Sequence, residues 1–216
     1  MSAIEQHLPT AASHDVHAHI LDLVPRGARV LDLGCGNGAL MAALQQQRDC
    51  TGYGVEIDDA NVLACVQRGV QVIQLNLDEG LTMFEDASFD VVLQIGTLQH
   101  LRNAEVMLRE TARVGRIGIV AFPNFAHWPN RLAVLRGRMP VTKALPYEWY
   151  NTPNIRVGTY ADFEVLAHKN GLRVLDAFGL QDGRMRRFWP NGLASTAVFK
   201  FCLLYTSPSP RDKRQS

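Results

Sequence analysis

Three glycines alternate with other residues in the stretch VLDLGCGNGA, which spans residues 30–39. Gly34, Gly36 and Gly38 can adopt backbone angles that other residues avoid, and they let a ligand approach the main chain closely. A helix beginning just after them would present free N–H groups and the positive end of its dipole to an anionic group. The pattern predicts a ligand-binding turn between a buried strand and a helix.

Two acidic residues accompany this turn. Asp32 precedes the first glycine of the turn, and Glu56 ends the apolar stretch GYGVE further along the chain. A carboxylate at the end of a second strand can accept hydrogen bonds from both hydroxyls of a ribose. The combination predicts a cofactor that contains a nucleoside.

The charge of Asp32 helps to choose the nucleoside. The letters GCGNGA satisfy the relaxed dinucleotide pattern G-x-G-x-x-G/A, but a pyrophosphate on these glycines would be repelled by Asp32. A cofactor with an ammonium and a sulfonium would be attracted instead. We therefore expect S-adenosylmethionine (SAM) or its demethylated product, S-adenosylhomocysteine, ahead of a nicotinamide dinucleotide. A P-loop is excluded because no G-K-[ST] follows.

The elements around the turn alternate along the chain. Strands are predicted at residues 29–33, 52–57, 70–75, 89–95, 116–122, 174–178 and 196–201, and helices at 15–24, 38–47, 59–68, 104–114 and 159–170. Alternation of this kind, with continuously apolar strands, predicts an α/β fold. Its mostly parallel, doubly wound sheet would be flanked by helices on both faces.

Residues 124–156 interrupt this alternation as a lid or insert. The segment contains one acid, Glu148, and is rich in basic and aromatic side chains: Arg131, Arg136, Arg138, Lys143, Arg156, Trp128, Tyr147, Trp149 and Tyr150. It could be a structural lid over the sheet edge, an acceptor pocket for an anionic small molecule, or a protein-docking surface. Tyr, Trp and Arg are frequent at interfaces, so composition alone leaves the three alternatives open.

Bulk composition excludes several classes of function. The chain has 216 residues, a formal net charge of +1 and no apolar stretch long enough to span a membrane. A nucleic-acid or membrane partner is therefore not expected. The four cysteines are scattered and the N-terminus lacks a secretory signal, so we expect free thiols in the cytoplasm.

Two further segments carry no predicted function. His14, His17 and His19 lack a completing cysteine or acid, so we expect no metal site and interpret them as a solvated helix face. Residues 202–216 include two Ser-Pro pairs and a charged end, which is typical of a disordered or artefactual tail.

Two longer stretches connect the chain to known families. VLDLGCGNG followed by GYGVEID resembles the first two motifs of class I SAM-dependent methyltransferases. Over residues 20–195 the chain further resembles the MetW family of methionine biosynthesis proteins, most specifically through RGRMPVTKALPYEWYNTPNI. The resemblance implies one Rossmann-like SAM-methyltransferase domain over residues 1–201.

The resemblance also implies a set of cofactor-binding residues. These are Asp32, Gly34, Gly36 and Gly38 in the first motif, Glu56 for the ribose, Ile57 beside the adenine, and Asn76 with Leu77 in the adenine loop. Asn76 stands where the superfamily often has an aspartate, and its carbonyl could still accept from the adenine amino group.

The segment after the fourth strand, GTLQHL at 96–101, would face the methionine portion of the cofactor and the reaction centre. His100 is the candidate general base there. The alternative is a histidine at a helix start that bonds to nearby backbone. Methyl transfer needs positioning more than acid–base chemistry, so a base is required only for a poor nucleophile.

The family resemblance implies a role beside homoserine O-acyltransferase, as a partner that supports that enzyme and senses SAM or its product. An active SAM-dependent methyltransferase acting on a small molecule is the alternative, so whether the chain is an enzyme stays open. A nucleotide-linked oxidoreductase is a more distant possibility.

Overall fold

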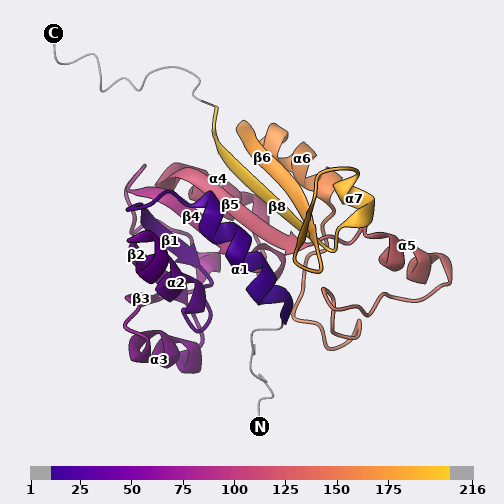
Figure 1. Cartoon of the computed structure of the whole chain (residues 1–216), viewed down its shortest axis with the longest axis horizontal. Helices are drawn as coiled ribbons and strands as arrows, with labels where there is room; N and C mark the ends of the chain where they lie inside the picture. The colour runs from indigo at the N-terminus through magenta and orange to yellow at the C-terminus, as the bar shows by residue number, and fades with distance from the viewer. Residues whose placement is uncertain (1–10, 205–216) are drawn as a thin grey trace.

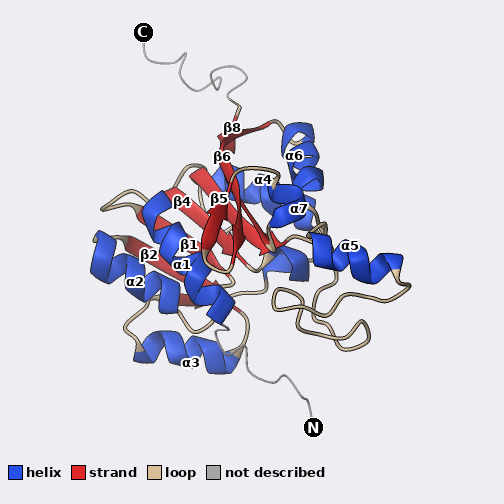
Figure 2. Cartoon of the chain, turned by 45° about the vertical axis from the view of Figure 1, so that its right-hand side comes forward, coloured by secondary structure: helices blue, strands red, loops and turns tan. Residues whose placement is uncertain are grey.

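The computed structural model describes residues 11–204, which form one eight-stranded sheet with helices on both faces (Figures 1 and 2). The strand order is β3-β2-β1-β4-β5-β8-β6-β7. The first five strands along the chain run parallel: β1 (Arg29–Leu33), β2 (Thr51–Glu56), β3 (Val72–Gln74), β4 (Phe89–Ile95) and β5 (Gly115–Pro123). The predicted α/β class and doubly wound sheet are confirmed.

The C-terminal third of the chain completes the sheet with three strands that pair antiparallel to their neighbours. β8 (Thr196–Leu203) lies antiparallel between β5 and β6 (Leu172–Gln181), and β7 (Arg184–Arg186) pairs antiparallel with the end of β6. The α-helices are α1 (Ala11–Leu23), α2 (Ala39–Arg48), α3 (Asp59–Gln67), α4 (Ala104–Val114), α5 (Trp128–Leu135), α6 (Tyr160–Lys169) and α7 (Pro190–Leu193).

Alternate residues of the central strands belong to opposite layers. Val30 packs with Ile20 of α1 and Leu44 of α2, whereas Leu31 packs in the layer that contains Leu108 of α4 and Phe163 of α6. Side chains of a strand point to opposite faces in turn, so a strand covered on both sides must be apolar throughout. This explains the unbroken apolar stretches in the sequence.

Strand order reverses at β1, which pairs with β2 on one side and β4 on the other. In open α/β sheets ligands bind beyond the carboxyl ends of the strands at such a switch point. The glycine turn after β1 and the segment after β4 therefore lie side by side, beyond the same edge of the sheet.

Several elements differ from expectation. α5, α7 and β7 were not predicted, because α5 lies inside the insert, α7 has only four residues and β7 is a fully exposed RMR. β8 continues two residues past the predicted domain end at residue 201, since Cys202 pairs with Arg173 and Leu203 with Leu172. The rest of the predicted tail, from residue 205, lies outside the described residues, as do residues 1–10.

His19 departs from the expected solvated face of α1. His19 is half-buried, and its Nε2 lies 2.9 Å from the carbonyl oxygen of Gly183 between β6 and β7. The side chain of His14 lies outside the described residues. Within the part of the chain that is described, no group of three or more potential ligand side chains could hold a metal ion. None of its helices is both long and apolar enough to cross a bilayer.

Aromatic side chains hold the C-terminal strands against α6. The Phe199 ring lies 4.5 Å from the ring of Phe163 and 4.6 Å from that of Tyr160, and it stacks on Phe122 at 6.2 Å between centroids. Phe199 is fully buried, so the packing of β5, β8 and α6 depends on it.

Replacing Phe199 by alanine would leave a cavity between β8 and α6. We expect Phe199→Ala to lower the free energy of unfolding by about 3–5 kcal/mol, as for other buried aromatic truncations. Denaturant titration measures this value. Phe188→Ala is the matched control, because that ring is 83% exposed; an equal loss in both variants would contradict the assigned packing.

Candidate functional site

The three glycines of the turn all have positive φ, at 73° for Gly34, 54° for Gly36 and 75° for Gly38. Their surroundings differ. A Cβ on Gly34 would lie 2.5 Å from Oγ1 of Thr97, and one on Gly38 would lie 2.9 Å from Sγ of Cys65. A Cβ on Gly36 would meet nothing within 4 Å. Protein atoms thus fill the space beside two of the glycines and leave open the space beside Gly36.

Thr97 and Val55 fix the path of the turn. The Thr97 hydroxyl donates to the carbonyl oxygen of Leu33 at 2.7 Å, and the amides of Gly34 and Cys35 donate to the carbonyl oxygen of Val55 at 2.8 and 3.0 Å. These bonds join the ends of β1, β2 and β4 at one place. Sequence reasoning missed Thr97, because its role depends on a contact between distant segments.

Asp32 is the buried acid of the site. Its side chain is 2% exposed, and the described residues supply no hydrogen-bond donor to its carboxylate. Burial, reinforced by the charge of Glu56, raises the pKa of Asp32 to about 7. A buried carboxylate without a donor is costly, so this position would gain from a cationic group bound nearby.

Glu56 lies at the same place but is well bonded. One oxygen, Oε2, accepts from the Gly36 amide at 2.8 Å, and Oε1 accepts from the amides of Ile57 at 2.8 Å and Asp58 at 3.0 Å. An ionised carboxylate has about four acceptor positions, so one position remains. Capture of both ribose hydroxyls would require the Gly36 amide to release Oε2, and the ribose role stays a prediction.

The predicted adenine-binding residues line the edge beyond β2 and β3. Ile57 is 59% exposed, as expected for a side chain that a ligand would cover. Asn76 caps η1 (Leu77–Glu79), and its Oδ1 accepts from the Asp78 amide at 3.1 Å. The side chain of Leu77 is buried in the core, so only its main chain is available to a ligand.

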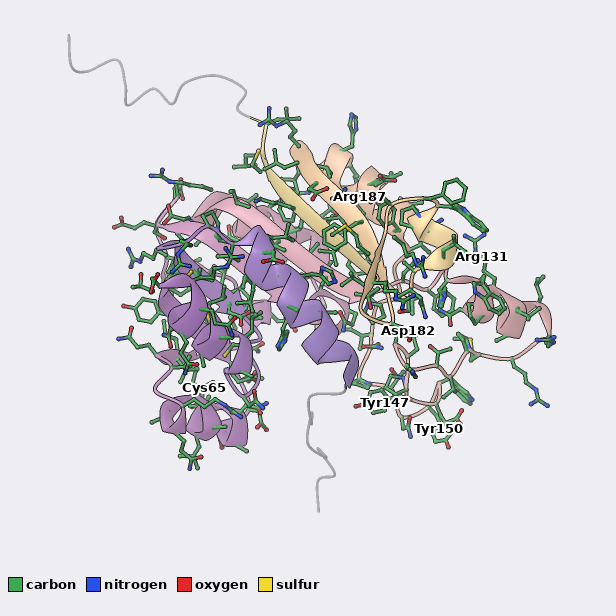
Figure 3. The ribbon with its side chains drawn as sticks, viewed as in Figure 1. Cys65, Arg131, Tyr147, Tyr150, Asp182 and Arg187 are labelled. Carbon is green, nitrogen blue, oxygen red and sulfur yellow. The ribbon has the colours of Figure 1, made fainter. Side chains whose placement is uncertain are left out.

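Two cysteines, Cys35 and Cys65, contact each other beside the glycine turn. Sγ of Cys35 lies 3.7 Å from Sγ of Cys65 on α3, and the Cys65 thiol donates to the Gly36 carbonyl at 3.2 Å. Burial is the main cause that raises the pKa of both thiols. They stay protonated at neutral pH and pack as apolar groups. Figure 3 shows Cys65, which belongs to α3, far from the labelled insert residues Tyr147 and Tyr150.

His100, the candidate base, ends η2 (Leu98–His100) after β4. Its Nδ1 lies 3.1 Å from the carbonyl oxygen of Pro153 in the insert, and its Nε2 lies 3.4 Å from Nε2 of Gln99. These contacts match the structural alternative, a histidine bonded to main chain, although the carbonyl comes from the insert. Its catalytic role stays a hypothesis.

The insert is bonded to the segment after β4. The amides of Ile155 and Arg156 both donate to the Gln99 carbonyl at 3.0 Å, while the Gln99 side chain donates to the carbonyl of Gly96 at 2.7 Å. At the other end of the insert, the buried Asn124 side chain donates to the carbonyls of Asn191 and Ala194 at 2.9 and 2.8 Å. The insert therefore covers the edge beside the predicted reaction centre and is tied to it.

Comparison with known protein families finds one family model that matches most of this chain. The family model described as "Methionine biosynthesis protein MetW" matches residues 14–201. A bifunctional methionine biosynthesis protein MetXA/MetW from Rhodopirellula baltica is 42% identical over 153 residues, which cover 66% of this chain and 25% of that protein. The matched part of this chain thus corresponds to a quarter of the length of that relative.

Solved structures share the fold at lower identity. A SAM-dependent methyltransferase from Thermotoga maritima, described as a possible histamine N-methyltransferase, has a TM-score of 0.64 and 18% identity, with 89% of this chain and 90% of that chain covered. The [4+2]-cyclase SpnF has a TM-score of 0.61 and 15% identity, covering 89% and 82%. Likeness at this level shows the fold and no particular reaction.

The ionisation of Asp32 predicts a pH-dependent stability. With a folded-state pKa near 7 against an ordinary 3.8, the native state holds its proton longer, so stability falls as the pH rises from about 4 to 7. We expect Asp32→Asn to raise the free energy of unfolding by about 2–3 kcal/mol more at pH 8 than at pH 5. Urea titrations at both pH values measure this.

The matched control is Asp90→Asn, because Asp90 is an exposed carboxylate of β4. It should give no comparable difference between the two pH values. A pH-independent effect of Asp32→Asn would contradict the raised pKa of the Asp32 carboxylate.

Proposed function

This chain belongs to the MetW family of methionine biosynthesis proteins, and from that premise we propose that it binds SAM or S-adenosylhomocysteine at the glycine turn and supports a homoserine O-acyltransferase. When bound, SAM would supply an ammonium and a methyl group on a positively charged sulfur. The chain's own residues would select and hold that ligand.

The buried Asp32 carboxylate carries the cofactor proposal. It lacks a hydrogen-bond donor from the described residues and lies near a second carboxylate, Glu56. A ligand ammonium, received directly or through water, would relieve the cost of burying this charge. A pyrophosphate would increase it, which disfavours a dinucleotide.

The rest of the turn fits the same ligand. The open space beside Gly36 admits a ligand to the main chain, and the exposed Ile57 side chain offers an apolar surface beside it. Glu56 and Asn76 keep unused acceptor positions on their carbonyl or carboxylate oxygens. These features support an adenosyl compound lying across the ends of β1 and β2.

The acyltransferase part of the proposal is supported by the family and by the insert. The Rhodopirellula baltica relative is described as MetXA/MetW, two parts in one polypeptide, and such fusions favour parts that work together. In this chain the insert exposes large apolar side chains, among them Leu135 at 83% and Trp149 and Tyr150 at 70%. Exposed aromatic groups beside arginines are common at protein interfaces.

Turnover of SAM on a small molecule is the second candidate function. A pocket whose wall includes Leu98 and Gln99 opens beside the segment after β4, which favours it. A good nucleophile would need no base, whereas a poor one would depend on His100, whose Nδ1 lies 3.1 Å from the Pro153 carbonyl oxygen. An acceptor screen with SAM present, in which no S-adenosylhomocysteine forms, would count against this candidate.

Gly36→Ala tests the cofactor site. The added methyl group would occupy the open space beside the turn, so we expect SAM affinity, measured by calorimetric titration, to fall by at least about tenfold. Gly171→Ala is the matched control, since Gly171 also has positive φ (66°) and nothing within 4 Å of a Cβ. Both changes should cost about 1 kcal/mol of stability, but only the first should affect SAM. Equal SAM affinity in the two variants would refute the site.

Mixing experiments test the partner. The purified chain and a homoserine O-acyltransferase encoded in the same genome should elute together from a sizing column, and the acylation rate should change when the chain is added. Adding SAM should alter that rate with the wild-type chain and not with Gly36→Ala. Separate elution together with an unchanged rate would remove the acyltransferase from the proposal and leave the cofactor site standing.

A further inference from the structure

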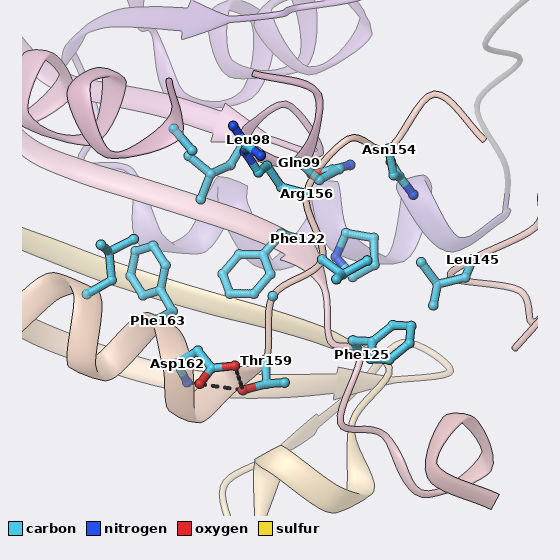
Figure 4. Close-up of a pocket in the computed structure, with 15 residues that line it drawn as sticks. Leu98, Gln99, Phe122, Phe125, Leu145, Asn154, Arg156, Thr159, Asp162 and Phe163 are labelled. Atoms are coloured by element: carbon cyan, nitrogen blue, oxygen red, sulfur yellow. Dashed lines mark hydrogen bonds between the residues drawn. The ribbon is translucent and has the colours of Figure 1, made fainter. Parts of the chain in front are cut away.

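A pocket of about 310 Å³ lies beside the predicted reaction centre and outside the glycine turn (Figure 4). Segments far apart in the sequence build it: η2, the start of α4, the end of β5, the insert with the residues that follow it, and α6. Ligand pockets of small molecules begin near this size. The position suggests a second ligand that would not compete with the cofactor for the glycine turn.

The walls of the pocket are mostly apolar. Its large apolar side chains come from η2, β5, the insert and α6: Leu98, Phe122, Phe125, Leu145, Phe163 and Leu166. In Figure 4 Phe122 lies between the labelled residues of η2 and those of α6, so it forms the middle of the wall. A pocket of this composition gains most from a ligand with an aromatic or branched apolar body.

Two charged side chains, Asp162 and Arg156, line the pocket, and their charges are offset by their surroundings to different degrees. Asp162 accepts from the Thr159 hydroxyl at 2.7 Å at the start of α6, where a negative charge is favoured by the helix dipole. Arg156 donates through Nη2 to the Arg102 carbonyl at 2.5 Å and forms no ion pair with the described residues. A guanidinium has five N–H donors, so most of those on Arg156 stay available.

We propose that this pocket binds a small organic anion, with its apolar body against Phe122 and Phe163 and its carboxylate or similar group on Arg156. The charge balance of the lining favours an anion, since the start of α6 and the Thr159 hydroxyl offset the charge of Asp162, whereas the guanidinium of Arg156 is bonded to one main-chain carbonyl. Charge-assisted pairing with a guanidinium gives both affinity and orientation.

The main chain holds Arg156 in place for this role. Its amide donates to the Gln99 carbonyl at 3.0 Å, as does that of Ile155. The base of the side chain is therefore fixed to η2, while the guanidinium is anchored at one nitrogen to Arg102. This preorganisation lowers the entropic cost of binding an anion.

Three probes with one apolar body test the proposal: 4-phenylbutyrate, 4-phenylbutanol and 4-phenylbutylamine. Saturation-transfer NMR titration of the full chain measures their binding. We expect saturable binding of the acid at millimolar concentration or below, and at least about tenfold weaker binding of the alcohol and the amine. No saturable binding of the acid up to about 5 mM, or equal binding of all three probes, would overturn the proposal.

Variants locate the site. Arg156→Gln should weaken the acid about tenfold and leave the alcohol unchanged, so that the preference for an anion disappears. Arg138→Gln, an exposed arginine of the insert outside the pocket, is the matched control and should keep the preference. A preference that survives Arg156→Gln would place the anion elsewhere and overturn the assignment.

Ala104→Phe would fill the pocket from the start of α4. It should abolish binding of all three probes while thermal melting and SAM titration report an intact fold and cofactor site. If this variant keeps a wild-type melting temperature and still binds the acid, the pocket is not the binding site. Because SAM is titrated separately, failure of the anion site leaves the cofactor proposal untouched.

Discussion

A carboxylate buried in the middle of a parallel sheet is the constraint around which this molecule is arranged. Asp32 pairs in register with Gly54 of β2 and Leu93 of β4, at the strand that separates the two halves of the sheet. Its charge is shielded from water and disfavoured by Glu56. Carboxylates with strongly raised pKa values are concentrated at functional sites. The glycines, the bonded Glu56 and the open space beside Gly36 all surround this acid.

The three glycines of one motif serve different physical purposes. Gly34 permits the contact with Thr97, Gly38 permits packing against Cys65, and Gly36 leaves the way to the main chain free. A sequence pattern treats them as equivalent. Only the three-dimensional surroundings distinguish glycines required for packing from the one available to a ligand. The fold itself is shared with a SAM-dependent methyltransferase and with a [4+2]-cyclase, so function has to be argued from such local differences.

Much of the fold could be predicted from periodicity, because a sheet covered on both faces demands apolar strands such as Phe89–Ile95. The acids and glycines of the candidate site could be predicted from type and spacing. Short or polar elements such as α7 and β7 could not, since they are stabilised by contacts with β6 rather than by their own pattern. The same holds for Thr97 and Gln99, whose roles arise from bonds to segments remote in sequence.

The paired amides on the Gln99 carbonyl have a mechanical consequence. The amides of Ile155 and Arg156 donate to the Gln99 carbonyl oxygen. The Gln99 side chain in turn donates to the carbonyl of Gly96, just after β4. A displacement of the insert would therefore disturb the hydrogen bonds that hold the segment after β4, which lies next to the glycine turn. If a partner bound the exposed aromatic side chains of the insert and shifted it, the glycine turn would be affected through these bonds, and by reciprocity a ligand at the turn would affect binding of that partner.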